Sequence, residues 1–167
     1  FIYFFIGTFV GGGVVLNGSL YPGRTGNAGA IGPIPVPGVN GSPQQLIDQA
    51  SLITLERELV SKGKDPSQLW MIDSDWSGFE KETERWLHIA AKGLAHATLA
   101  AAAIIDFQTA LIDGIFPPAL RSKFVEMVGE EIYHLDLQGI VAPHIEEGSI
   151  GRVARALGGA SLPLFDH

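Results

Sequence analysis

The sequence predicts an α/β domain in which helices cover a mixed five-stranded sheet. Three extended segments come first, and helical and strand-like segments follow in the order β-β-β-α-α-β-α-β-α. Of the 167 residues, 46% are apolar and only 17% are charged, which suits a sheet with both faces buried. The length allows one proper hydrophobic core. We therefore expect residues 1–167 to form a single domain.

The first thirty-six residues carry the clearest pattern. An apolar run at 1–6 meets a glycine-rich bend, and a second apolar run at 14–16 reaches an Asn17-Gly18 turn. The glycines assigned to the bend are Gly7, Gly11, Gly12 and Gly13. This pattern predicts a tight hairpin, whose glycines let a ligand approach the backbone closely. Residues 27–36 predict a third extended segment, and a loop rich in Pro, Gly and Asn follows at 35–43.

Two helices follow this loop. Apolar residues recur with a roughly helical period over residues 44–62, and Ser42 is a plausible cap. The longest helix is expected over residues 78–105. Ser77 with Glu80 three residues later has the spacing of a capping box, and acidic residues crowd the first turns, where the helix dipole favours them.

The C-terminal part alternates strand and helix. Residues 109–112 predict a short strand that Asp113-Gly114 closes, and two prolines at 117–118 open a helix that ends near residue 135. A last strand is expected between residues 140 and 145. A final helix is expected over residues 152–157, before Gly158-Gly159.

Composition excludes several classes of function. The chain has no cysteine, which rules out disulfides, thiolate metal sites and a cysteine nucleophile, and fits a cytoplasmic protein. The formal charge is −7, and the eleven Lys and Arg residues are scattered, which argues against direct DNA binding by this segment. The apolar stretch at 1–15 is cut by glycines, and the stretch at 89–105 carries Lys92 and His96, so we expect no membrane partner. Because the chain starts inside an apparent strand and without methionine, we expect it to be a piece of a longer protein.

The glycine pattern resembles the ROK family of repressors, open reading frames and sugar kinases. The resemblance rests on the run from Gly7 to Val15, on Gly23, on Gly26-Asn27-Ala28-Gly29 and on Ile31-Gly32. Later glycine motifs at residues 111–114 and 156–160 fit the same family. The family implies the second half of a two-lobed protein with the actin-like ATPase fold, with a sugar in the cleft and, in the kinases, ATP beneath it. It also implies that the catalytic Asp precedes the first strand of this chain, so this segment alone does not transfer a phosphoryl group.

The resemblance also implies ligand positions. Backbone N–H groups of the first hairpin would cradle phosphates, which requires small residues. The residues assigned to an ATP site are Gly7, Thr8, Gly11, Gly12, Gly13 and Gly114. Asn27 and Gly29 are assigned to a sugar. The chain departs from the family where Phe9 replaces a glycine and where Asp113, near the expected adenosine pocket, replaces another.

Residues that bind sugar and zinc in the family are replaced in this chain. The family Glu that grips sugar hydroxyls is Ala30 here, and the His that binds sugar and zinc is Pro33. A further family Glu aligns with Ile47, and without cysteines we expect no zinc. A hydrogen bond to a charged group contributes about 1.5–3 kcal/mol. Losing two carboxylates and an imidazole removes several such bonds. The expected loss of sugar affinity is on the order of a thousandfold.

Three other patterns have competing interpretations. Asp73-x-Asp75-x-Ser77-Gly78 with Glu84 matches a calcium-loop spacing, although Ser77 is equally a helix cap. His88, Lys92 and His96, with Glu84 one turn earlier, form a polar stripe that is either a solvated or interface surface or a metal site. The three tryptophans, which are core residues or a sugar-stacking platform, are Trp70, Trp76 and Trp86.

Three hypotheses follow. The chain is the effector-sensing and dimerisation domain of a ROK-type transcriptional regulator, which senses a sugar or sugar phosphate, forms a homodimer and reaches DNA only through a domain outside this chain. Alternatively, it is a fragment of a divergent ATP-dependent sugar kinase. The third is an assembly module with an empty cleft. In the first hypothesis, the alanine-rich stretch at 89–105 is expected to pack against another subunit.

Overall fold

A computed structural model describes residues 1–151. Its main sheet contains strands β1 (Ile2–Ile6), β2 (Val10–Leu16), β3 (Ser19–Leu20), β6 (Thr109–Gly114) and β7 (His144–Glu147). The spatial order is β3-β2-β1-β6-β7. The first three strands are antiparallel neighbours, whereas β6 pairs parallel to both β1 and β7. The predicted mixed five-stranded sheet is confirmed, while the predicted helix at 152–157 lies outside the described residues.

The third strand differs from the prediction. Asn17 and Gly18 both have positive φ, which turns the chain directly back into β3. The predicted third extended segment at 27–36 is mostly turns and irregular backbone. Only Pro35–Pro37 is extended, as β4, and it pairs with β5 (Pro43–Gln45) in a separate two-stranded sheet. The loop predicted at 35–43 is shorter than expected: only residues 38–42 connect the two strands, because both ends of the predicted range pair in the hairpin.

The predicted helix over 44–62 is two helices, α1 (Ile47–Ala50) and α2 (Leu52–Ser61), and Ser42 caps neither. Ser51 interrupts them with extended backbone, at ψ 140°. Tertiary bonds favour the break over a continuous helix. The Ser51 hydroxyl accepts from the Val10 N–H at 3.0 Å, and its carbonyl accepts from the Trp86 indole at 3.3 Å.

The remaining helices are the 3-10 helix η1 (Pro66–Trp70), α3 (Glu80–Ile105) and α4 (Pro118–Tyr133). The predicted capping box at the start of α3 is wrong, because Phe79 is the N-cap. The Ser77 N–H donates to Asp75 at 3.0 Å, and the Glu80 carboxylate accepts from the Gly78 N–H at 2.9 Å. The acidic first turn remains favourable for the helix dipole.

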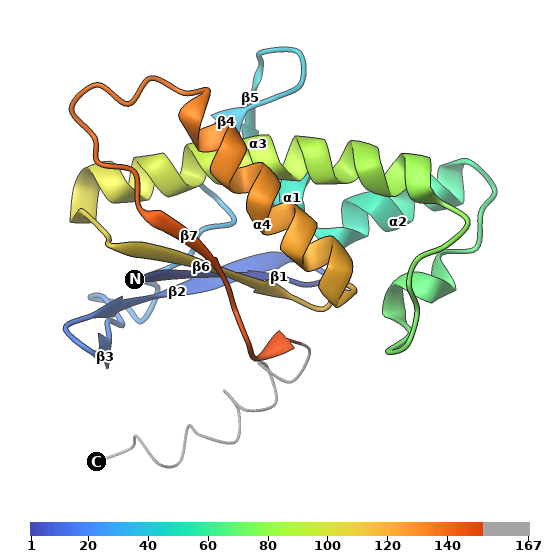
Figure 1. Cartoon of the computed structure of the whole chain (residues 1–167), viewed down its shortest axis with the longest axis horizontal. Coiled ribbons are helices and arrows are strands. Elements are labelled where there is room, and N and C mark those ends of the chain that lie inside the picture. Colours follow the sequence, from blue (N-terminus) through green and yellow to red (C-terminus); the bar gives the residue numbers. More distant parts are fainter. Residues whose placement is uncertain (152–167) are drawn as a thin grey trace.

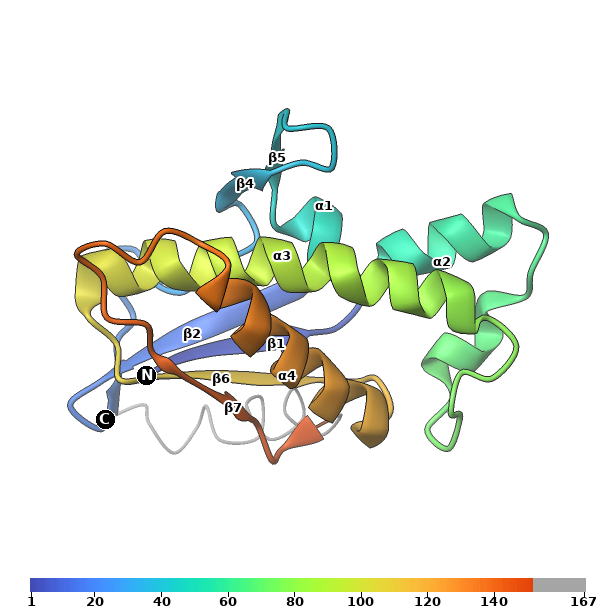
Figure 2. The same ribbon diagram turned by 45° about the horizontal axis from the view of Figure 1, so that its top comes forward.

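Helices α3 and α4 lie on one face of the sheet (Figure 1), and Figure 2 shows this layer from a second direction. Alternate residues of β1 (Ile2, Phe4 and Ile6) are buried. At one end of the core, aromatic rings 5.8–6.5 Å apart form a cluster. We call this group the aromatic cluster: Trp76, Phe79, Trp86, Phe116 and Phe124.

Helix α3 is a core helix of this domain. Among the described residues, it is the helix that is long and apolar enough, by length and composition, to cross a membrane. Half of its most apolar stretch is nevertheless buried within the domain. The buried alanines (Ala90, Ala91, Ala95, Ala97 and Ala102) pack inside the domain. The small side chains on which the subunit-packing prediction rested are thus largely used internally.

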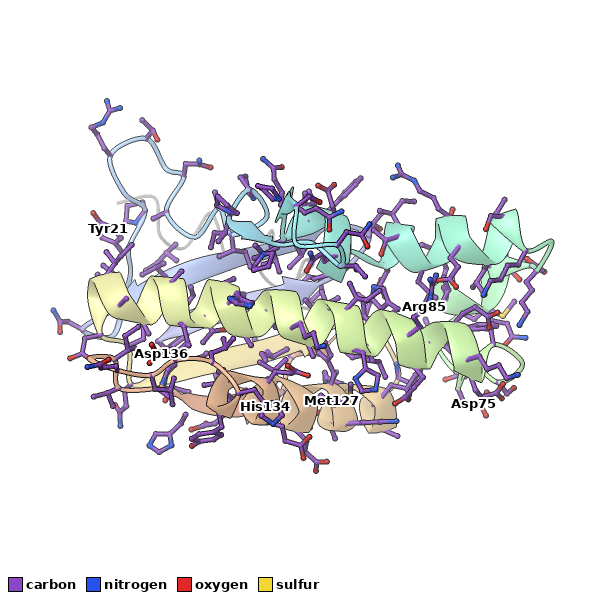
Figure 3. All side chains as sticks on the ribbon, turned by 90° about the horizontal axis from the view of Figure 1, so that it is seen from above. Tyr21, Asp75, Arg85, Met127, His134 and Asp136 are labelled. Atoms are coloured by element: carbon purple, nitrogen blue, oxygen red, sulfur yellow. The ribbon has the colours of Figure 1, made fainter. Side chains whose placement is uncertain are left out.

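Ion pairs join α2 to the start of α3. Glu82 accepts from Lys62 at 3.1 Å and from Lys64 at 2.9 Å, while Arg85 pairs with Glu58. Figure 3 shows Arg85 on the side of α3 that faces α2. The bonds from Lys64, and then from Lys62, lower the pKa of Glu82 to about 2. The folded state therefore favours the ionised form of Glu82.

This network predicts an acid-sensitive contribution to stability. Since the pKa of Glu82 is depressed in the folded state, its contribution is present above the unfolded pKa, near 4.5, and is lost as the pH falls toward 2. Glu82→Gln is expected to lower the unfolding free energy at pH 7 and to lose less stability than the wild type between pH 4.5 and 2. Urea unfolding of both proteins over this range measures the effect. Parallel pH curves for the variant and the wild type would contradict it.

Candidate functional site

The first hairpin turns more tightly than predicted. Strand β2 begins at Val10, so the bend consists of residues 7–9 only. Gly11, Gly12 and Gly13 lie within β2, opposite Phe5, Phe4 and Tyr3 respectively. Their assignment to the bend is corrected, because ladder pairing to β1 continues through all three glycines.

Packing accounts for several of the predicted ligand glycines. A Cβ on Gly12 would overlap the Tyr3 carbonyl oxygen. A Cβ on Gly29, which has φ +82°, would lie 2.5 Å from the Gly13 Cα. A Cβ on Gly114 would overlap the Phe116 ring and lie 2.7 Å from the Ile6 carbonyl oxygen. These glycines allow close approach of one chain segment to another. Their role toward a ligand stays a prediction.

A hollow of about 420 Å³ lies at the hairpin turn. Four of the residues that the sequence assigned to a phosphate cradle, Gly7, Thr8, Gly11 and Gly12, line it together. A Cβ on Gly11 would meet nothing within 4 Å, so packing does not explain this glycine. Phe9 also lines the hollow, and its side chain is 58% exposed. The structure therefore brings the bulky ring into the same space as the small residues.

Helix α2 fixes the conformation of this turn. The Leu52 and Ile53 N–H groups donate to the carbonyl oxygens of Gly7 and Thr8 at 3.0 and 3.2 Å. These are N–H groups of the first helical turn, which have no partner within a helix. The turn oxygens satisfy them, so the turn is held in place without a ligand.

Asp113 is the last residue but one of β6, where it pairs with Phe5 of β1, and it is fully buried. Its carboxylate accepts from the Tyr3 hydroxyl at 3.1 Å, and from the N–H groups of Ile150 at 3.0 Å and Gly151 at 2.8 Å. The N–H of the next residue, Gly114, also donates to this carboxylate, at 2.8 Å. Burial, and next the Asp113 charge, raise the pKa of Tyr3.

The guanidinium of Arg121, on α4, completes this arrangement. Its Nη1 lies 3.4 Å from Asp113, and its Nε donates to Glu147 at 2.8 Å. The sequence analysis named Asp113 and its neighbour Gly114, but none of the donors from other segments of the chain. Ile150 and Gly151 are 37 and 38 residues away along the chain, so no local pattern reveals the contact.

The predicted sugar residues line a second, apolar groove of about 580 Å³. Asn27, Gly29 and Ala30 lie on one side of it, and Ile104 and Ile105 at the end of α3 lie on the other. Asn27 is the one residue with a polar side chain among the described lining residues. The position that would supply a carboxylate is the methyl group of Ala30.

Comparison with known proteins identifies the family. Over residues 1–163, the sequence matches the family model described as ROK family. The chain belongs to the ROK family. No curated protein matches the sequence.

Solved structures of ROK proteins share the fold. A ROK hexokinase from Thermus thermophilus superposes with a TM-score of 0.70 and 25% identity, covering 99% of this chain and 58% of that one. A ROK glucokinase from Streptomyces griseus, in complex with glucose and AMPPNP, superposes with a TM-score of 0.68 and 19% identity, covering 96% of this chain and 59% of that one. A ROK transcriptional regulator, a homologue of the E. coli MLC protein, superposes with a TM-score of 0.61 and 17% identity, covering 87% of this chain and 41% of that one. The chain therefore spans about half the length of these ROK proteins.

Ile47, which the resemblance aligns with a family Glu, lies against Gly32. Ile47 donates its N–H to the Gly32 carbonyl at 2.9 Å, and a Cβ on Gly32 would lie 3.5 Å from the Ile47 side chain. Ile47 thus lies against the same loop as Pro33. The alignment of Ile47 with the family Glu stays a prediction.

The metal alternatives lack support. Residues 1–151 contain no group of three His, Asp or Glu side chains that could hold a metal ion. Glu84, the last residue of the calcium-loop spacing, accepts from Lys123 at 2.5 Å and lies 3.4 Å from His88. Asp75 is at the turn before α3, as Figure 3 shows, and accepts from the Ser77 backbone.

The polar stripe and the tryptophans are also placed. His88, Lys92 and His96 line a shallow pocket beside the connection between β4 and β5. Trp76 and Trp86 are buried in the aromatic cluster, which confirms the core interpretation for both. The Trp70 indole donates to Glu56 at 2.7 Å. Neither buried tryptophan can serve as an open platform for a sugar.

Proposed function

We propose that the chain is the C-terminal effector-sensing and dimerisation domain of a ROK-type transcriptional regulator that has lost sugar-kinase chemistry. The observation that carries the proposal is that apolar residues stand at three positions where the family has polar ligand residues. Ala30, Pro33 and Ile47 stand where the resemblance implies two carboxylates and an imidazole. A regulator needs only to bind a ligand and change orientation, so it tolerates losses that stop catalysis.

A divergent ATP-dependent sugar kinase is the second candidate. The hollow lined by Gly7, Thr8 and Gly11 favours it, because small residues and open space remain at the hairpin turn. Solved relatives include kinases as well as a regulator, so the fold agrees with both candidates. A kinase would need a catalytic Asp in the part of the protein that precedes this chain.

Calorimetry of the full-length protein against ATP and a panel of sugars tests the choice. The regulator proposal expects no ATP turnover with any sugar, and a DNA-binding helix-turn-helix upstream of this chain. ATP binding at millimolar concentration or tighter, with phosphorylation of any sugar, would overturn it. A full-length protein that binds neither sugar, sugar phosphate nor nucleotide would instead favour an assembly module.

The partners in this proposal are a second copy of the chain, a sugar or sugar-phosphate effector, and DNA through a separate domain, in the cytoplasm. Because the buried alanines of α3 pack internally, the dimer contact would use its exposed end, where Ile104 is 81% exposed. Ile104→Glu is expected to raise the dimer dissociation constant at least about tenfold. Sedimentation equilibrium measures this, and a wild-type chain that stays monomeric at high concentration contradicts the dimer.

A further inference from the structure

We infer that the Asp113 carboxylate fills an anion-binding site at the end of the sheet. It accepts from the donors of this site and thereby excludes phosphate from them. The inference goes beyond the proposed function, because it concerns which ligands this position admits, whatever the effector is. Asp113 is thus assigned as a specificity-determining residue.

The donor set has the composition of a phosphate site. Backbone N–H groups of Gly114, Ile150 and Gly151 converge on the carboxylate, at 2.8–3.0 Å. The Tyr3 hydroxyl and the Arg121 guanidinium add a neutral donor and a positive charge. Clustered backbone N–H groups beside glycines form anion-binding concavities in proteins, and arginine suits phosphate oxygens. A single carboxylate here receives donors from four separate segments of the chain.

The location fits a ligand as well. Strands β1 and β6 are parallel, and both end at this position. After these ends the chain diverges, since β1 leads into the hairpin with β2 and β6 leads toward α4. Ligands of open α/β sheets bind outside the carboxyl ends of strands where the connections diverge. Tyr3 both lines the hollow at the hairpin turn and donates to Asp113, so the two places adjoin.

Residues 148–151 close tightly over the carboxylate. A Cβ on Gly148 would lie 2.7 Å from the Asp113 Cβ, and Gly151 has φ +59°. With the aspartate side chain in place, the site therefore leaves no room for a further anion. Removing this side chain frees both the donors and the space, and a buried donor without a partner is costly. An added anion can then take the vacated place.

Anion rescue separates this role from a merely structural one. Asp113→Ala in the 167-residue chain is expected to lower Tm, and inorganic phosphate is expected to raise it again saturably, by about 2–4 °C or more relative to chloride of equal ionic strength. Asp113→Asn fills the same space and is the matched control, so it is expected to show no such rise. The wild type is also expected to show none. Arg121→Met added to Asp113→Ala is expected to abolish the rescue.

A structural role alone predicts that Asp113→Ala loses stability equally in phosphate and in chloride, and this result would overturn the inference. A wild-type chain that responds to phosphate as strongly as the variant would overturn it too. If Asp113→Ala does not fold in chloride, refolding yield of Asp113→Gly from urea replaces Tm: a higher yield in phosphate supports the inference, and equal yields refute it. ATP in place of phosphate shows whether the vacated site also accepts a nucleotide.

Discussion

Gly12→Ala is expected to destabilise the domain by about 1–3 kcal/mol or more, while Gly11→Ala in the same strand is tolerated or slightly stabilising. A Cβ on Gly12 overlaps the Tyr3 carbonyl oxygen, which belongs to the paired strand β1 and cannot move aside. The Ile31 side chain, 3.0 Å away, restricts the same space. A loss of this size is a large share of the 5–15 kcal/mol that typically stabilises a domain.

Gly11→Ala is the matched control, because the two glycines are adjacent and both belong to the glycine pattern of the family. A Cβ at Gly11 meets nothing within 4 Å, and alanine reduces the entropy of the unfolded chain by about 0.4–1 kcal/mol. Urea unfolding of the two variants and the wild type measures both effects. Equal destabilisation by the two substitutions would show that the close contact at Gly12 does not determine its need for glycine.

Gly11→Ala also separates ligand binding from packing. Because Gly11 lines the hollow at the hairpin turn without a packing requirement, loss of ATP binding in a stable Gly11→Ala variant of the full-length protein would favour the kinase candidate. The regulator proposal expects no sugar phosphorylation by either the variant or the wild type. The same variant thus serves as a stability control and as a test of the hollow.

Trp86→Ala is expected to cost about 3–5 kcal/mol, the range measured for deleting large buried aromatic side chains. Trp86 is 3% exposed and contacts three other rings of the aromatic cluster, with the Phe116 and Phe124 ring centroids 5.9 Å away. Its indole N–H also donates to the Ser51 carbonyl, at the break between α1 and α2. The substitution removes packing and leaves that buried carbonyl without this bond.

Two controls divide these contributions. Trp86→Phe keeps an aromatic ring but loses the indole bond, and is expected to cost less than half as much as alanine. Trp70→Ala applies the same deletion to a partly buried tryptophan outside the aromatic cluster and is expected to be milder. Chemical denaturation of the three variants gives the comparison. A Trp70→Ala loss equal to that of Trp86→Ala would contradict the central place of the aromatic cluster.

Only part of the candidate site follows from local sequence. The alternation of Ile2, Phe4 and Ile6 and the glycines after them predicted a strand and a close hairpin, because strand periodicity and glycine geometry are local properties. The start of β2 at Val10 was missed, since glycines weaken a strand signal even where a partner strand pairs with them. The break at Ser51 was missed for a related reason: it is stabilised by bonds to Val10 and Trp86, far along the chain.

The class of sheet, the order of its main elements and, through the glycine pattern, membership of the ROK family all follow from the amino-acid sequence. It also located the departures at Phe9, Ala30, Pro33 and Asp113, because a changed side chain is visible without a structure. The tertiary structure was needed to show that Gly12 and Gly29 serve packing and that Gly11 lines the hollow without a packing requirement. It alone showed that Asp113 is surrounded by donors from four segments, because such convergence depends on how distant segments pack and not on any local pattern.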